Sequence, residues 1–175
     1  MDLKKYIRNI PDYPKKGILF RDITTLIKNA DAFNKTIDEL IIRSKKIEFD
    51  KIAAIESRGF VFGSAVSYIL KKPFIMLRKK NKLPADKYSV DFELEYGNAT
   101  IEVHKDSISK NEKILIIDDL IATGGTAEAA AKLVEISKGK VASFIFIIDL
   151  FDLSGAKNLL EKGYKVDSLI KFPGH

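Results

Sequence analysis

The chain has 175 residues, and 30 Lys and Arg against 24 Asp and Glu give a formal net charge of +6 at pH 7. Hydrophobic residues make up 46% of the sequence and charged residues 31%, a mixture typical of one globular domain, so a disordered chain is excluded. Because there is no cysteine and there are only two histidines, disulfides and a thiol nucleophile are impossible, and a histidine or cysteine metal site is not expected.

The N-terminal segment lacks the apolar core of a signal peptide, and no apolar run approaches the roughly 20 residues needed to span a bilayer. We therefore expect a cytoplasmic protein with no membrane partner. The positive charge permits an anionic partner such as nucleic acid, but the position of the charge is more informative than its sum.

Apolar runs alternate with helical stretches along the whole chain. Asp31 is placed to N-cap a helix whose apolar side chains recur at helical spacing as far as Ile41. This alternation predicts right-handed βαβ units and a mostly parallel sheet with helices on both faces. The further predicted elements, in chain order, are a strand at Lys51–Ile55, a turn at Glu56–Gly59, a helix at Phe60–Leu70, a strand at Phe74–Leu77, a β-hairpin at Val90–Val103 with its turn at Gly97–Asn98, a strand at Lys113–Ile117, a helix at Thr126–Ser137, and strands at Phe144–Ile148 and Val166–Ile170.

The most informative segment joins the strand at Lys113–Ile117 to the next helix through two acids and a Gly-Gly turn. Gly124 and Gly125 allow the backbone to approach an anion closely, and the N–H groups that open the helix lie at the positive end of its dipole. Thr123 and Thr126 add hydroxyl donors. Neither the Lys of the P-loop nor the three-glycine dinucleotide spacing is present, so the segment predicts a different kind of phosphate site.

Asp118 and Asp119 stand one short loop before that phosphate site, about as far from it as a sugar 5′-phosphate is from its ring hydroxyls. Carboxylates accept hydrogen bonds well from a vicinal diol, so the acids and the loop together favour a ribose 5-phosphate ligand. The alternative is that the acid pair and the glycines only end a strand and begin a helix.

The segment Asp118–Thr126 resembles the signature of the type I phosphoribosyltransferases, and further motifs in the same order resemble the adenine phosphoribosyltransferases within that family. The resemblance implies a single domain over residues 1–175 with the type I fold, an N-terminal hood over about residues 1–30 and a β-hairpin over the active site. The motifs that carry it are Ile10–Pro14, Gly17–Asp22, Glu56–Phe60, Arg78–Lys79 with Lys82–Pro84, Leu94–Gly97, Asp118–Thr126 and Phe172–His175.

The family's reaction transfers the 5-phosphoribosyl group from phosphoribosyl pyrophosphate to adenine, giving AMP and pyrophosphate in purine salvage. The resemblance implies Mg²⁺ as cofactor, held mainly by substrate oxygens and water, with Asp118 or Asp119 at most an outer partner and no direct protein ligand. It also implies a homodimer.

The resemblance further implies roles for individual residues. Phosphoribosyl and AMP binding would fall to Asp118, Asp119, Ala122, Thr123, Gly124, Gly125 and Thr126. Pyrophosphate binding would fall to a second turn, which in this family often holds a cis peptide, and to part of the basic stretch Lys71–Lys82, namely Glu56, Ser57, Arg58, Gly59, Arg78, Lys79 and Lys82. Ser57 stands where the commoner family form has Ala, and we expect little change from it.

Adenine would be bound under the hood by Leu19, Phe20 and Arg21, with Arg58 beside it. Phe20 would stack on the base, and main-chain groups near Leu19 and Arg21 would read its exocyclic amine. Core packing is the alternative for Phe20, and a surface ion pair is the alternative for Arg58.

The reaction also needs a group that takes a proton from adenine. Hypoxanthine–guanine enzymes of the superfamily place an acid just before the Thr of the phosphate loop, whereas this chain has Ala122 there. We therefore expect Glu95 on the hairpin to accept this proton, and we include Asp119 and Arg58 among the catalytic residues. The alternative for Glu95 is an exposed charge on a strand without a catalytic role.

Two rival functions remain open. One is a phosphoribosyltransferase for another base, such as xanthine or orotate. The other is a transcriptional regulator on the same fold, but such regulators usually add a helix-turn-helix domain, and the segment before the hood is too short for one. We therefore expect no nucleic-acid partner.

Overall fold

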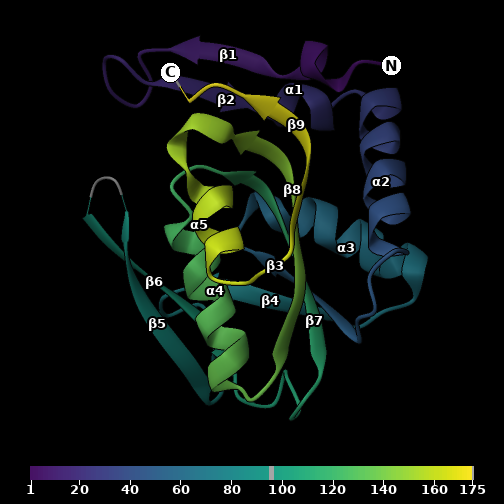
Figure 1. The fold of residues 1–175 in the computed structure, drawn as a ribbon, viewed down its shortest axis with the longest axis vertical. Helices are drawn as coiled ribbons and strands as arrows, with labels where there is room; N and C mark the ends of the chain where they lie inside the picture. The colour runs from purple at the N-terminus through teal and green to yellow at the C-terminus, as the bar shows by residue number, and fades with distance from the viewer. Residues whose placement is uncertain (95–96, 175) are drawn as a thin grey trace.

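The computed structural model describes residues 1–94 and 97–174, and its ribbon is drawn in Figure 1. Those residues form a seven-stranded sheet in the order β5-β6-β4-β3-β7-β8-β9. Strands β4, β3, β7, β8 and β9 run parallel, and the β5–β6 hairpin joins antiparallel at the β4 edge, so the predicted mostly parallel sheet is confirmed. The strand bounds are β3 Lys51–Ile55, β4 Phe74–Lys79, β5 Lys87–Leu94, β6 Gly97–His104, β7 Lys113–Ile121, β8 Lys140–Leu150 and β9 Val166–Phe172.

Helices cover both faces of the sheet, as predicted. On one face, α2 (Ala30–Ser44) and α3 (Arg58–Leu70) enclose a core with one set of side chains from the central strands. On the other, α4 (Gly125–Ile136) and α5 (Gly155–Glu161) enclose a second core. Strand β7 contributes apolar side chains to both cores, as is typical of a parallel strand that is covered on both faces.

The N-terminal segment forms a separate two-stranded ribbon, β1 (Arg8–Pro11) paired antiparallel with β2 (Leu19–Asp22). Figure 1 shows it across the top of the sheet, beside the end of β9. The short elements around it are η1 (Leu3–Tyr6) and α1 (Thr24–Ile27), and η2 (Phe151–Leu153) follows β8. This ribbon corresponds to the expected hood.

An ion pair holds the two hood strands together: Arg8 Nη2 lies 2.5 Å from the Oδ2 atom of Asp22. Burial alone would raise the pKa of Asp22, but hydrogen bonds from Thr24 and Arg8 outweigh it and lower that pKa to about 2. Asp22 is therefore an ionised, buried anchor of the hood.

Two local predictions were wrong. The α2 helix is capped by Asn29, whose side chain accepts a 2.9 Å hydrogen bond from the Ala32 N–H, so Asp31 lies in the first turn instead of at the N-cap. Asn and Asp cap helices about equally well, and here Asn29 has the extended backbone that a cap requires. In the hairpin, Gly97 pairs with Leu94, so Gly97 and the following Asn98 belong to β6 and not to the turn.

The acid pair lies within strand β7, which the sequence pattern ended at Ile117. Asp118 pairs with Phe146 of β8, and the pairing continues to Ile121 because β8 itself runs to Leu150. Charged side chains are rare at buried strand positions, which is why the apolar pattern ended the strand too early.

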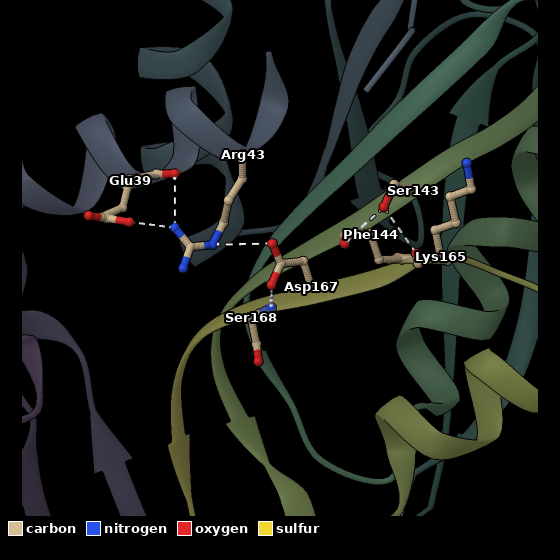
Figure 2. Close-up of polar contacts among 7 residues, drawn as sticks. All are labelled: Glu39, Arg43, Ser143, Phe144, Lys165, Asp167 and Ser168. Carbon is tan, nitrogen blue, oxygen red and sulfur yellow. Dashed lines mark hydrogen bonds and ion pairs between the residues drawn. The ribbon is translucent and has the colours of Figure 1, made fainter. Parts of the chain in front are cut away.

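Contacts at the far end of β9 tie it to helix α2 (Figure 2). The Arg43 guanidinium forms two ion pairs. Its Nη1 atom lies 2.5 Å from Glu39 Oε2, and its Nε atom lies 3.2 Å from Asp167 Oδ2. Nearby, the Ser143 hydroxyl donates to the Lys165 carbonyl at 3.1 Å.

Among the described residues, no helix combines the length and apolar character needed to cross a membrane.

Candidate active site

A cleft of about 390 Å³ opens at the carboxyl ends of β3 and β7. The chain leaves β3 toward β4 on one side and later returns to β7 on the other, so the cleft lies where the strand order reverses. Open parallel sheets bind ligands at such a point, because the helices that follow the two strands diverge to opposite faces. The cleft is lined by Ile55, Glu56, Ser57, Arg58, Asp118, Asp119, Leu120, Ile121, Ala122, Thr123, Gly124, Gly125, Thr126, Ala127 and Phe146.

The predicted phosphate loop forms one wall of the cleft. Gly124 has φ +93°, a conformation that suits glycine, and α4 begins at the next residue. The first N–H groups of a helix lack intrahelical partners, so the start of α4 offers donors to an anion.

Gly155 supports this loop, and sequence reasoning missed it. Its N–H donates to the Ala122 carbonyl at 3.0 Å, and a Cβ atom on Gly155 would lie only 2.3 Å from that oxygen. The only signal was a Ser-Gly pair after a buried strand, which marks a loop but not its neighbour.

A second helix begins in the opposite wall. The peptide bond between Glu56 and Ser57 is cis, as the resemblance implied, and α3 begins at Arg58. A Cβ atom on Gly59 would lie 2.7 Å from Asp118 Oδ1, so glycine allows the first turn of α3 to approach β7 closely. The starts of α3 and α4 therefore bracket the acid pair.

Asp118 and Asp119 are buried between these two helix starts, with 8% and 5% of their surface exposed. Burial raises the pKa of Asp118 well above its ordinary value, and the neighbouring Asp119 charge raises it further. Burial also raises the pKa of Asp119, while the Arg58 guanidinium opposes that shift. The Arg58 Nε atom lies 2.8 Å from Asp119 Oδ2, so its partner is a buried acid of the cleft rather than a surface group.

Arg58 also connects the acids to the hood. Its guanidinium carbon lies 5.7 Å from the centroid of the Phe20 ring, and Tyr13 packs edge-on against that ring at 5.2 Å. Phe20 is half-buried and belongs to neither core cluster of the described residues, so simple core packing does not describe it. An aromatic face, a cation and two buried carboxylates are thus brought together between the hood and the cleft.

Comparison with known proteins identifies the family to which this chain belongs. The profile of the phosphoribosyl transferase domain matches residues 24–174. An adenine phosphoribosyltransferase of Pelagibacter ubique (strain HTCC1062) is 75% identical over 175 residues, covering 100% of both chains. The chain belongs to the adenine phosphoribosyltransferases.

Solved structures of the family share the whole fold. The crystal structure of adenine phosphoribosyltransferase from Thermoanaerobacter pseudethanolicus is 49% identical, with a TM-score of 0.93 over 97% of this chain and 98% of that one. The Saccharomyces cerevisiae enzyme, complexed with D-2,5-dideoxy-2,5-imino-altritol 1,6-bisphosphate and adenine, is 34% identical, with a TM-score of 0.89 over 95% and 96% of the two chains. The expected type I phosphoribosyltransferase fold is confirmed.

In this member of the family, the Arg21 side chain is directed to the chain terminus and not to the cleft. Its Nη1 atom donates to Asn9 Oδ1 at 2.5 Å and its Nη2 atom to the Pro173 carbonyl at 3.0 Å, with only 5% of the residue exposed. Only main-chain groups of Arg21 are left for contact with a base. Leu19 and Phe20 lie above the cleft without lining it.

The basic residues assigned to pyrophosphate gather beside Glu56. The Glu56 carboxylate accepts from the Lys79 N–H at 2.9 Å and from Arg78 Nε at 3.3 Å, and Arg78 also donates to the Lys82 carbonyl. Burial would raise the pKa of Glu56, but these hydrogen bonds outweigh it and lower that pKa. The end of β4 is thus fastened to the turn before α3, although its basic side chains do not line the cleft itself.

Glu95 and Tyr96 lie outside the described residues, as does His175. The adjoining part of the hairpin is close to the phosphate loop: a Cβ atom on Gly125 would come within 2.8 Å of the Glu93 carbonyl. Within residues 1–94 and 97–174, no group of three or more metal-ligating acids or histidines occurs.

Proposed function

We propose that this cleft carries out the family's reaction, with phosphoribosyl pyrophosphate bound across both helix starts and adenine bound between the cleft and the hood. The 5′-phosphate lies on residues 123–126 at the start of α4, and the ribose hydroxyls face Asp118 and Asp119. The diphosphate lies against the turn at residues 56–59.

One observation carries this proposal: two buried carboxylates lie between two helix N-termini in one cleft. The helix starts suit two anionic groups, and the carboxylates suit the hydroxyls that separate those groups. A substrate with a phosphate at one end, a diol in the middle and a diphosphate at the other end matches this order of groups.

The transfer forms the bond between adenine N9 and ribose C1′ and breaks the bond between C1′ and the diphosphate oxygen, which leaves with the electron pair. N–H donors of the first turn of α3 stabilise the charge that develops on the departing diphosphate. The cations of Arg78 and Lys79, which lie beside Glu56 and outside the cleft lining, add a positive potential to that charge. The proton on the imidazole ring of adenine passes to Glu95.

Adenine recognition rests on the hood. Phe20 offers an aromatic face next to the Arg58 guanidinium, and main-chain groups of Leu19 and Arg21 are next to that ring in β2. The adenine carried by the yeast relative supports the same base for this chain.

Mg²⁺ fits this site as an ion held by the substrate. The Asp118 and Asp119 carboxylates are buried, their pKa values are raised, and Asp119 is paired with Arg58, so neither suits direct ligation. They would hold the ion through water, with diphosphate oxygens as its ligands. When bound, Mg²⁺ neutralises charge on the diphosphate.

The homodimer is a further proposal. On α3, the apolar side chains of Val61, Tyr68 and Ile69 are 38%, 86% and 50% exposed, which is unusual for a helix that faces only solvent. We expect a second copy to cover this face. Sedimentation should give the mass of a dimer for the parent protein and of a monomer for Tyr68→Glu; a monomeric parent would contradict the proposal.

The function is tested by incubating the protein with phosphoribosyl pyrophosphate, Mg²⁺ and one base at a time, and measuring nucleotide and pyrophosphate by chromatography. We expect AMP from adenine and far less product from hypoxanthine, guanine, xanthine or orotate. Turnover of xanthine or orotate without AMP formation would overturn the assignment of the base.

A further inference from the structure

The last residues of β9 and those that follow it lie against the hood. In Figure 1 the yellow end of β9 reaches strand β2, and the contacts are specific. Arg21 of β2 donates to the Pro173 carbonyl at 3.0 Å, and its guanidinium carbon lies 4.6 Å from the centroid of the Phe172 ring. Phe172–Gly174 is called the tail below.

The β2 strand presents opposite faces to the cleft and to the tail. Successive side chains of a strand point to opposite sides, so Phe20 faces Arg58 while the next residue, Arg21, faces the tail. Asn9, the cross-strand partner of Arg21, accepts a 2.5 Å hydrogen bond that fixes the guanidinium. The position of the aromatic face is therefore tied to a contact on the other side of the same strand.

The tail is held in turn by the segment after β8. The Gly174 N–H donates to Asp152 Oδ1 at 2.5 Å, and a Cβ atom on Gly174 would lie 2.6 Å from Leu153 Cγ. Asp152 also acts on Arg21: burial lowers the pKa of Arg21, and the Asp152 charge opposes that shift. Three residues further on, Gly155 supports the phosphate loop through Ala122.

We propose that Arg21 and Asp152 are positioning residues that fasten the hood through the tail and so set the affinity for adenine. This inference rests on the proposed base site. A two-stranded ribbon is marginally stable by itself, so its place over the cleft depends on such contacts. Losing them allows Phe20 to move while the acids and the phosphate loop stay in place.

The test is steady-state kinetics with each substrate varied in turn, on Arg21→Gln and Asp152→Ala. We expect the KM for adenine to rise about tenfold in each, the loss of a hydrogen bond to a charged group, with the KM for phosphoribosyl pyrophosphate within about twofold of the parent value. Asp152→Asn keeps an oxygen acceptor for the Gly174 N–H and should restore most of the affinity.

The matched control is Asp167→Ala, which removes a carboxylate from the other end of β9, where it meets Arg43 (Figure 2). Both KM values should be unchanged there. Equal rises of both KM values in Asp152→Ala, or no rise, would overturn the inference; should Arg21→Gln fail to fold, the exposed Asp152 still decides it. A parent protein that makes no AMP would instead overturn the proposed function, and this inference with it.

Discussion

The Nε atom of Arg58 lies 2.8 Å from the Oδ2 atom of Asp119, and its guanidinium carbon lies 5.7 Å from the Phe20 ring centroid. One side chain therefore touches both the acid assigned to the ribose and the aromatic face assigned to the base. Because Asp119 is buried, its charge depends on this cation more than a surface carboxylate would. In the proposed complex, this ion pair lies between the ribose and the base.

We expect Asp119→Asn and Arg58→Gln each to lower kcat/KM by about 10- to 100-fold, the value of a charge-assisted hydrogen bond. If the two residues act as a unit, the double variant loses much less than the product of the single losses. Steady-state kinetics of all four proteins measures this coupling.

The control for this pair is Arg43→Gln with Asp167→Asn, an ion pair of 3.2 Å on α2 and β9 away from the cleft. These changes should leave kcat/KM within about twofold of the parent value, since neither side chain lines the cleft. Losses that multiply in the Arg58 and Asp119 double variant would show that the two residues act independently.

The central sheet and the strand, Gly-Gly turn and helix of the proposed phosphate loop were predictable because their signals are local. Strand β7 is apolar on both faces, and the Gly-Gly turn before a helix is a direct backbone signature of an anion site. The end of β7 was not predictable, because its pairing with β8 and not its own side chains carries it through Asp118 and Asp119.

The hood and its contacts could not be read from the sequence in the same way. Arg21 and Pro173 are 152 residues apart, and no local pattern indicates that a guanidinium from one end of the chain meets a carbonyl at the other. The resemblance implied that main-chain groups near Arg21 contact adenine, and it gave no indication that the Arg21 side chain binds the tail. The short helix α5, which begins at Gly155, was missed because seven residues carry too little periodicity.

Asp118 predicts an unusual dependence of stability on pH. Its pKa is raised in the folded protein by burial and by Asp119, so the folded state binds its proton more tightly than the unfolded chain does. Its contribution to the free energy of unfolding is therefore greatest below the unfolded pKa near 3.8 and is lost as the pH rises toward the folded pKa.

Asp118→Asn removes the ionisable group, so the loss of folding stability at neutral pH that the Asp118 charge causes should disappear. The amide keeps the oxygen that accepts a hydrogen bond from the Asp119 N–H. We expect the variant to be more stable than the parent at neutral pH by about 1–3 kcal/mol, the cost of an incompletely satisfied buried polar group, and the difference to shrink toward about pH 4. Denaturant unfolding across this pH range measures it. A variant that is less stable than the parent at neutral pH would contradict the raised pKa. We also expect turnover to fall as stability rises, because the ribose loses a carboxylate acceptor.

Gly155→Ala tests the support of the phosphate loop. The new methyl would lie 2.3 Å from the Ala122 carbonyl oxygen and 2.8 Å from the Gly124 nitrogen, both backbone atoms, so the loop must move. We expect the KM for phosphoribosyl pyrophosphate to rise about tenfold or more and the stability to fall by about 1–3 kcal/mol.

The control is Gly163→Ala, at a glycine with φ +88° and no atom within 4 Å of the added Cβ. It should destabilise the fold by about 1–2 kcal/mol through backbone strain alone and leave the KM values unchanged. If both variants raise the KM for phosphoribosyl pyrophosphate to the same extent, general loss of stability explains the effect and the support of the loop by Gly155 does not.

Glu95→Gln tests the proton acceptor. Gln keeps the size and polarity of the side chain but cannot take a proton at neutral pH, so we expect the chemical step to slow by about 10²- to 10⁴-fold while adenine binding changes little. Single-turnover kinetics separates the chemical step from product release, and equilibrium titration measures the binding of adenine. Glu93→Gln is the matched control, because Glu93 is an exposed acid of β5 only two residues before Glu95 in the chain. A Glu95→Gln variant that reacts as fast as Glu93→Gln would show that the proton of adenine leaves by another route.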